Sequence, residues 1–258
     1  MSQPHPPPPL LDAGTVDTQV REGVATVTFG HPKSNSLPGA LLAGLAEAID
    51  AAGRDPAARV IVLRSEGSGA FCAGASFEEL KAVGDKAAGK RFFSGFAKVI
   101  LAMIRCPRLV VTRMQGKTAG GGVGLIAASD YALAAAGASL RLSELALGLG
   151  PFVVGPVIEK KIGLAAFGAL AVDAEWRSAA WAHQHGLYAE VLDTAEELDR
   201  RVDAFAARLA GRSPEAMRRL KEVLWEGTEG WPDLLAARAE ISGELVTTEF
   251  ARKVLGTT

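Results

Sequence analysis

Short apolar segments alternate with helical patterns up to about residue 193, and only helical patterns follow beyond that point. The segment 59–65 (RVIVLRS) is a continuous apolar run of the kind that is buried on both faces of a parallel sheet, and 109–114 (LVVTRM) is a second. Strands that alternate with helices are typical of an α/β core. The helices from about Leu198 onward then form a C-terminal appendage to that core.

Individual elements can be placed by their hydrophobic period and their flanking residues. Pro38 suits the first turn of a helix, where its missing N–H group costs nothing. The expected strands are 24–29, 59–65, 109–114 and 131–135, and the expected helices are 37–52, one starting at Phe77, 89–104, one opened by the glycines of 115–130, 156–171, 176–185, 195–209, 214–225 and 234–247.

The charge of the chain is nearly balanced, with 28 basic and 29 acidic residues and a formal net charge of −1. The sequence contains no charged block that would bind nucleic acid or coat an anionic membrane. It also contains no run of about 18 apolar residues, the length that a membrane-spanning helix requires. We therefore expect neither nucleic acid nor a membrane as a partner.

The cysteines and histidines do not suggest a metal site. Cys72 and Cys106 have the spacing of neither metal ligands nor a disulfide framework, which is typical of reduced thiols in a cytoplasmic protein. His183 and His185 are two positions apart, so a helix would point them in different directions. Residues 1–14 lack the features of a secretory signal and are expected to form a disordered, Pro-rich tail. We expect a cytoplasmic protein without a metal.

Two glycine-centred segments, 71–76 (FCAGAS) and 119–122 (AGGG), each lead from a loop into a helix. The first N–H groups of a helix lack intrahelical partners and lie at its positive end. Two such donors on one oxygen would form an oxyanion hole, where each donor contributes about 3–4 kcal/mol. For either segment alone, tight packing of a helix on a strand is the better explanation of the small residues.

A nominal dinucleotide fingerprint overlaps the second segment. Gly122, Gly124 and Ala127 satisfy G-x-G-x-x-A, and Glu144 follows Gly124 by twenty residues. In a nucleotide-binding fold the acidic residue would end the next strand, but the strand expected at 131–135 ends in alanine. An NAD-dependent oxidoreductase is therefore a minor alternative.

Three segments together resemble one family. FCAGASFEEL is similar to F-x-A-G-A-D-x-x-E-x, QGKTAGGGVGLIAASD to x-G-x-A-x-G-G-G-x-E-L-x-x-x-x-D, and LRLSELALGLGPFVVG to F-x-x-P-E-x-x-x-G-x-x-P-x-x-G. These are motifs of the crotonase (enoyl-CoA hydratase/isomerase) superfamily, and the likeness extends over about 16–258. It implies an α/β spiral of ββα units over 15–197, followed by a helical region, 198–258, that forms trimers, often paired as hexamers.

The resemblance also implies roles for particular residues. The oxyanion hole would be the backbone N–H groups of Ala75 and Gly121, and Glu144 would be the catalytic acid and base beside an acyl-CoA thioester. Coenzyme A is then part of the substrate, and no separate cofactor is expected. Trp225, Trp231 and Leu234 are large apolar groups that could be buried between subunits. The residues expected to contact the substrate are Asn35, Ala73, Gly74, Gly120 and Phe152.

The chain departs from the hydratase pattern at several positions. The first of the two hydratase glutamates is replaced by Gly124, and the usual aspartate and proline are Ser76 and Ser143. One carboxylate suffices to move a double bond, whereas hydration would need Ser76, Ser143 or a backbone group to hold water. An apolar wall of Leu147, Leu149 and Phe152 would raise the pKa of Glu144. We expect isomerisation or hydration of an enoyl-CoA; a non-catalytic CoA-binding or an RNA-binding protein of this fold is the alternative.

Overall fold

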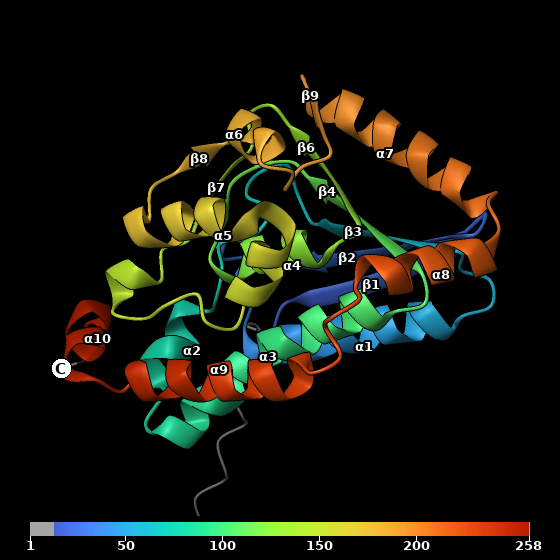
Figure 1. Cartoon of the computed structure of the whole chain (residues 1–258). Helices are drawn as coiled ribbons and strands as arrows, with labels where there is room; N and C mark the ends of the chain where they lie inside the picture. Colours follow the sequence, from blue (N-terminus) through green and yellow to red (C-terminus); the bar gives the residue numbers. More distant parts are fainter. Residues whose placement is uncertain (1–12, 258) are drawn as a thin grey trace, which may run out of the picture.

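The computed structural model of the chain describes residues 13–257, so the predicted tail up to residue 12 lies outside the described residues. Two β-sheets and a set of helices pack together (Figure 1). None of the helices in the described part combines the length and apolar character needed to cross a membrane. The α/β class predicted from the alternating pattern is confirmed.

A six-stranded sheet forms the centre of the molecule. Its strand order is β1-β2-β3-β4-β6-β9, and all neighbours are parallel except β1 and β2. The edge strands β1 and β9 were not predicted, because β1 is mostly polar and exposed and β9 has only three residues. The strands are β1 (Thr15–Arg21), β2 (Val24–Gly30), β3 (Val60–Ser65), β4 (Leu109–Met114), β6 (Tyr131–Ala135) and β9 (Glu190–Leu192).

The two faces of this sheet are covered by different helices. Ile61 and Leu63 of β3 belong to the main core, which includes residues of α1 (Gly39–Arg54) and α3 (Lys86–Arg105). Val60 and Val62 alternate to the other face, where they pack with residues of α7 (Ala195–Ala210). Figure 1 shows α7 along one side of the sheet and α1 with α3 along the other.

Pro38 is the N-cap of α1 and lies just before the helix, not within its first turn as predicted. The predicted helix over 176–185 is shorter in the structure, because Arg177–Ser178 form β8 and α6 spans only Ala179–Gln184. Gly163, with a φ of 78°, interrupts α5 (Gly155–Asp173).

A small second sheet carries the segments that the motifs occupy. β7 (Ser139–Arg141) pairs in parallel with β5 (Thr118–Ala119) and antiparallel with β8. α4 (Gly121–Ala128) follows β5 directly and is buried along its whole length. The motif carrying the glutamate continues from β7 into a short 3-10 helix, η1 (Leu145–Leu147). The sheet therefore brings two of the three family motifs side by side.

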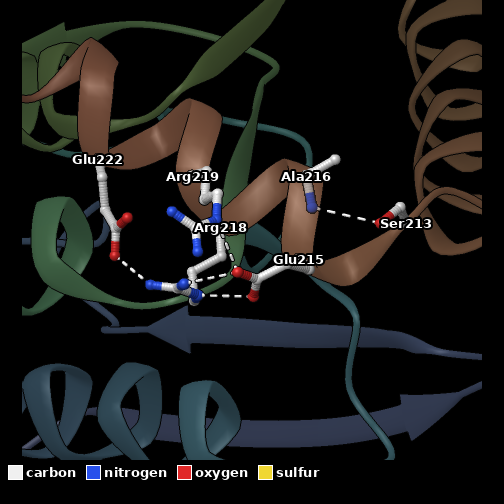
Figure 2. Close-up of polar contacts among 6 residues, drawn as sticks. All are labelled: Ser213, Glu215, Ala216, Arg218, Arg219 and Glu222. Atoms are coloured by element: carbon white, nitrogen blue, oxygen red, sulfur yellow. Dashed lines mark hydrogen bonds and ion pairs between the residues drawn. The ribbon is translucent and has the colours of Figure 1, made fainter.

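The predicted C-terminal helices are present as α7, α8 (Pro214–Leu224), α9 (Trp231–Leu245) and α10 (Glu249–Leu255). The exposed side of α8 carries an ion-pair network in which Glu215 accepts hydrogen bonds from Arg218 and Arg219, and Arg218 also contacts Glu222 (Figure 2). The hydroxyl of Ser213 caps the helix by accepting the Ala216 N–H.

The buried side of α8 anchors it to the core. Lys221 Nζ lies 3.0 Å from Asp130 Oδ2, and both side chains are almost fully buried. The Trp225 indole donates to the other oxygen of Asp130 at 2.7 Å, and the rings of Trp225 and Trp231 pack edge to face. Both tryptophans are thus buried within one chain, which corrects the expectation that they lie between subunits.

Candidate active site

A cavity of about 300 Å³ lies where the motif segments meet. Its walls come from the loop before α2 (Phe77–Ala82), from α3, from the start of α4 and from the segment 141–154. All but one of the predicted site residues line it: Ala73, Gly74, Ala75, Gly120, Gly121, Glu144 and Phe152.

The first glycine segment, 71–76, is fixed beside this cavity by a parallel β-bridge between Ala75 and Leu37 of the preceding loop. The Leu37 N–H donates to the Gly74 carbonyl at 2.8 Å, and the Ser76 N–H donates to the Leu37 carbonyl at 3.2 Å. Because bonding in such a bridge alternates along the chain, the N–H of Ala75 points away from Leu37. Gly74 has a φ of +91°, and an added Cβ there would lie 3.0 Å from the Ala119 carbonyl oxygen, so the two motif segments are in contact.

The second glycine segment supplies the other predicted donor. Gly121 is the first residue of α4, a position whose N–H has no partner within the helix. The preceding Gly120 has a φ of +50°, and its N–H donates to the Arg141 carbonyl at 3.0 Å. A Cβ added to Gly121 would lie 2.1 Å from the Phe96 ring, so only glycine fits there. Ala75 and Gly121, both predicted donors, therefore border one cavity.

Glu144 lies against the same glycines. A Cβ added to Gly120 would be 3.1 Å from Glu144 Oε1, so the carboxylate covers the Gly120 backbone. The residue as a whole is partly exposed, but its Oε2 atom is buried and has no hydrogen-bond partner among the described residues. Burial raises the pKa of Glu144 to about 7, against the lowering effect of the backbone N–H groups of Glu144 and Ser143.

This pKa confirms the prediction that an apolar wall desolvates Glu144. Leu147, Leu149 and Phe152 all line the cavity, as expected. A carboxyl group with a pKa near 7 can both take up and release a proton at neutral pH.

Asn35 is the predicted residue that the structure does not place at the cavity. Its Oδ1 accepts the His31 N–H at 3.0 Å, and its Nδ2 donates to the carbonyls of Glu66 and Ala70, each at 2.9 Å. Asn35 also has a φ of 56°, a left-handed conformation that asparagine tolerates better than most residues. Its side chain therefore fixes the shape of the loop, and its predicted contact with the CoA part of the substrate stays a prediction.

The departures from the hydratase pattern have structural explanations. Gly124 is buried inside α4, and a Cβ added there would lie 2.5 Å from Val154 Cγ1, so Val154 fills the space that a side chain would need. The Ser76 hydroxyl caps α2 by accepting the Glu79 N–H at 3.3 Å, and Ser76 does not line the cavity. Ser143 does line it. Among the described residues that line the cavity, Glu144 is the only acid.

The same packing argues against a dinucleotide site at α4. A Cβ added to Gly122 would lie 2.4 Å from Thr118 Oγ1 and 2.7 Å from Cys72 Cβ. The glycines of the nominal fingerprint thus face the protein interior, where no pyrophosphate could approach them. Within the described residues, no group of three His, Cys, Asp or Glu side chains could hold a metal ion.

The charged cavity residue that sequence reasoning missed is Arg141. Arg141 lines the cavity from the end of β7, with its guanidinium carbon 4.8 Å from the centre of the Trp176 ring. Nothing in its local sequence distinguishes it from an arginine on a solvent-facing strand.

Comparisons with known proteins agree with this geometry. The family model described as enoyl-CoA hydratase/isomerase matches residues 19–252. A (7aS)-7a-methyl-1,5-dioxo-2,3,5,6,7,7a-hexahydro-1H-indene-carboxyl-CoA hydrolase of Rhodococcus jostii is 30% identical over 82% of this chain and 80% of its own length. The mitochondrial methylglutaconyl-CoA hydratase of Rattus norvegicus is 32% identical over 76% of this chain and 63% of its own.

The fold is shared with solved structures. That of an enoyl-CoA hydratase from Mycobacterium avium subsp. paratuberculosis matches with a TM-score of 0.83 and 24% identity, over 93% of this chain and 97% of that one. The family match covers most of the sequence and includes the three motifs that surround the cavity. The chain therefore belongs to the enoyl-CoA hydratase/isomerase family and is an acyl-CoA-processing enzyme of the crotonase type.

Proposed function

We propose that this enzyme moves the double bond of an enoyl-CoA, with Glu144 as the single acid and base. The observation that carries the proposal is that Glu144 is the only acidic side chain among the described residues lining the cavity. The second carboxylate of the two-glutamate hydration mechanism has no space, because Val154 packs directly on Gly124.

The chemistry needs one base and one oxyanion site. Glu144 removes a proton from the carbon between the thioester and a 3,4-double bond, and the electron pair moves onto the thioester oxygen. The N–H groups of Ala75 and Gly121 stabilise that enolate oxygen. The protonated Glu144 then returns the proton to the γ carbon as the double bond shifts to the 2,3-position. No atom is gained or lost, and no cofactor is needed beyond the coenzyme A of the substrate.

The pKa of Glu144 suits this cycle. At a pKa of about 7, the carboxylate form is abundant at neutral pH, and its conjugate acid is strong enough to return the proton. The apolar surroundings that raise the pKa also keep bulk water away from the enolate.

To test this, a 3-enoyl-CoA and a 2-enoyl-CoA are each incubated with the wild-type enzyme and with the Glu144→Gln variant, and the products are separated by chromatography. We expect bond migration to exceed water addition, and the variant to lose both. Exchange of the α-proton in deuterated water provides a second readout for Glu144. Hydration that is faster than migration would contradict the proposal, and a chain that catalyses neither reaction nor exchange would be a non-catalytic CoA binder.

Hydration by one glutamate is the second candidate, supported by Ser143. This serine lines the cavity next to Glu144, whereas the Ser76 hydroxyl is occupied as a helix cap. The rat relative is a hydratase, and it aligns with three quarters of this chain. If hydration is observed, Ser143→Ala should reduce it selectively, while Ser76→Ala should act mainly on stability.

We also propose that the enzyme assembles as a homotrimer or homohexamer. Large apolar side chains are exposed on α5 and α8, including Leu164, Val172, Leu220 and Val223. Such groups on a single chain favour burial against another surface. Sedimentation equilibrium would test this assembly, and a monomer at micromolar concentration would contradict it.

A further inference from the structure

Arg141 is the only cationic side chain among the described residues that line the active-site cavity. It lies three positions before Glu144, at the end of β7. Its carbonyl accepts the Gly120 N–H at 3.0 Å, which ties its main chain to the glycine segment beside the predicted oxyanion hole. The arginine is therefore part of the same wall as the catalytic carboxylate.

The polar atoms of the Arg141 side chain are poorly satisfied. Its Nε atom is buried and has no hydrogen-bond partner among the described residues. The contact that holds the guanidinium is with the face of Trp176, at 4.8 Å from the ring centre. A guanidinium keeps its charge at any physiological pH and carries five N–H donors, so a buried donor without an acceptor is costly.

Glu144 does not supply the missing acceptor. Its Oε2 atom is buried and also unpartnered. Neither the buried Arg141 Nε atom nor the buried Glu144 Oε2 atom has a hydrogen-bond partner among the described residues, so these two atoms do not pair with each other. The cavity thus presents an unpaired acid and an unpaired cation at separate places on one wall.

We propose that Arg141 binds a carboxylate carried by the acyl group, so that the substrate is an acyl-CoA whose acyl chain bears a second acidic group. This inference rests on the proposed function of the cavity as the acyl site. A planar guanidinium matches a carboxylate with two parallel hydrogen bonds, and the Trp176 ring holds that plane in place.

An anion at Arg141 could also be a phosphate of the coenzyme. The size of the cavity favours the acyl carboxylate: about 300 Å³ is at the lower end of the range for small-molecule sites and accommodates an acyl group better than a whole coenzyme. Arg141 lines this cavity together with the apolar residues Leu80, Phe93 and Phe96. A purely hydrocarbon chain would leave the guanidinium without an acceptor.

The test measures binding of glutaryl-CoA, butyryl-CoA and free coenzyme A by calorimetry to the full-length protein. We expect the wild type to bind glutaryl-CoA roughly 30- to 100-fold more tightly than butyryl-CoA, the range for a well-formed charge pair in a partly buried site. Arg141→Gln should remove this preference and leave the binding of butyryl-CoA and free coenzyme A within about 3-fold of wild type. Arg141→Lys should keep part of it.

Lys117→Gln is the matched control. Lys117 Nζ lies 5.5 Å from the centre of the same Trp176 ring, but Lys117 is exposed and does not line the cavity. Its substitution removes one positive charge and should leave the preference for glutaryl-CoA unchanged. If Arg141→Gln weakened the binding of all three ligands equally, the guanidinium would contact the coenzyme, and the proposal would be overturned. Equal affinity of the wild type for glutaryl-CoA and butyryl-CoA would also overturn it.

The acyl chains of glutaryl-CoA and butyryl-CoA contain no double bond that could migrate. The binding result therefore does not depend on the chemistry of Glu144. A protein that prefers glutaryl-CoA but isomerises no enoyl-CoA would refute the proposed function alone. A protein that isomerises enoyl-CoA but shows no preference would refute the role of Arg141 alone.

Discussion

Replacing Glu144 with glutamine tests the burial of this carboxylate through stability, and its proposed catalytic role through activity. In the folded protein, burial raises the pKa of Glu144 from 4.5 to about 7. One pKa unit corresponds to about 1.4 kcal/mol, so an ionised Glu144 destabilises the fold by roughly 3 kcal/mol well above pH 7.

The sign follows from proton binding. A raised pKa means that the folded state holds the proton more tightly than the unfolded state, so the associated stability is present below about pH 4.5 and is lost as pH rises through about 7. Glutamine has no proton to lose. The stability of Glu144→Gln relative to wild type should therefore increase by roughly 2–3 kcal/mol between pH 5 and pH 8.5.

The assay is urea unfolding followed by tryptophan fluorescence at both pH values, without ligand. Glu47→Gln is the control, because Glu47 is an exposed carboxylate on α1. Turnover should fall by about 10²- to 10⁴-fold in Glu144→Gln only. A difference from wild type that is the same at both pH values would refute the burial argument, even if activity were lost.

Three further substitutions test the packing around the site. Gly124→Glu should not place a second acid in the cavity, because its Cβ would lie 2.5 Å from Val154 Cγ1. We expect urea unfolding to show a destabilisation of at least about 1–3 kcal/mol, and product analysis to show no gain in hydration. Gly121→Ala, whose added Cβ would be 2.1 Å from an aromatic ring of α3, should cost about 1–3 kcal/mol and lower turnover by shifting the start of α4, and unchanged stability and activity would contradict this packing argument. Lys221→Met should cost about 3–5 kcal/mol, because it leaves Asp130 buried without its cation 3.0 Å away, and an unchanged unfolding midpoint would contradict this.

The central fold could be predicted because its strands are nearly continuous apolar runs. β4 and β6 have the predicted bounds, and β3 differs by one residue, since burial on both faces leaves a plain signal in sequence. β1 gives no such signal, because the chain over Thr15–Arg21 is mostly polar and its pairing is fixed by the turn at Glu22 and Gly23. Both turn residues have positive φ, as a tight hairpin between twisted strands requires.

The site could be predicted in outline for a similar reason. Short motifs fix backbone geometry locally, and Ala75, Gly121 and Glu144 all reach one cavity. The loop-fixing role of Asn35 could not be predicted, because its neighbours in sequence do not reveal that its amide bonds to carbonyls more than thirty positions away. The proposed role of Arg141 was missed because it depends on the lack of a partner for its side chain, and the local sequence does not reveal this.

The three glycines at the start of α4 explain why this family site carries one carboxylate. Gly120 accommodates the Glu144 carboxylate, an added Cβ on Gly121 would meet a ring of α3, and Gly124 is covered by Val154. Position 124 is therefore a packing contact with the chain that follows Glu144, so a second acid there would displace the segment 150–154 that also forms the cavity wall. Among the described residues that line the cavity, the charged side chains are consequently confined to Arg141 and Glu144. If both proposals hold, the choice of reaction depends on how Glu144 is desolvated, and the choice of substrate depends on the anion that Arg141 accepts.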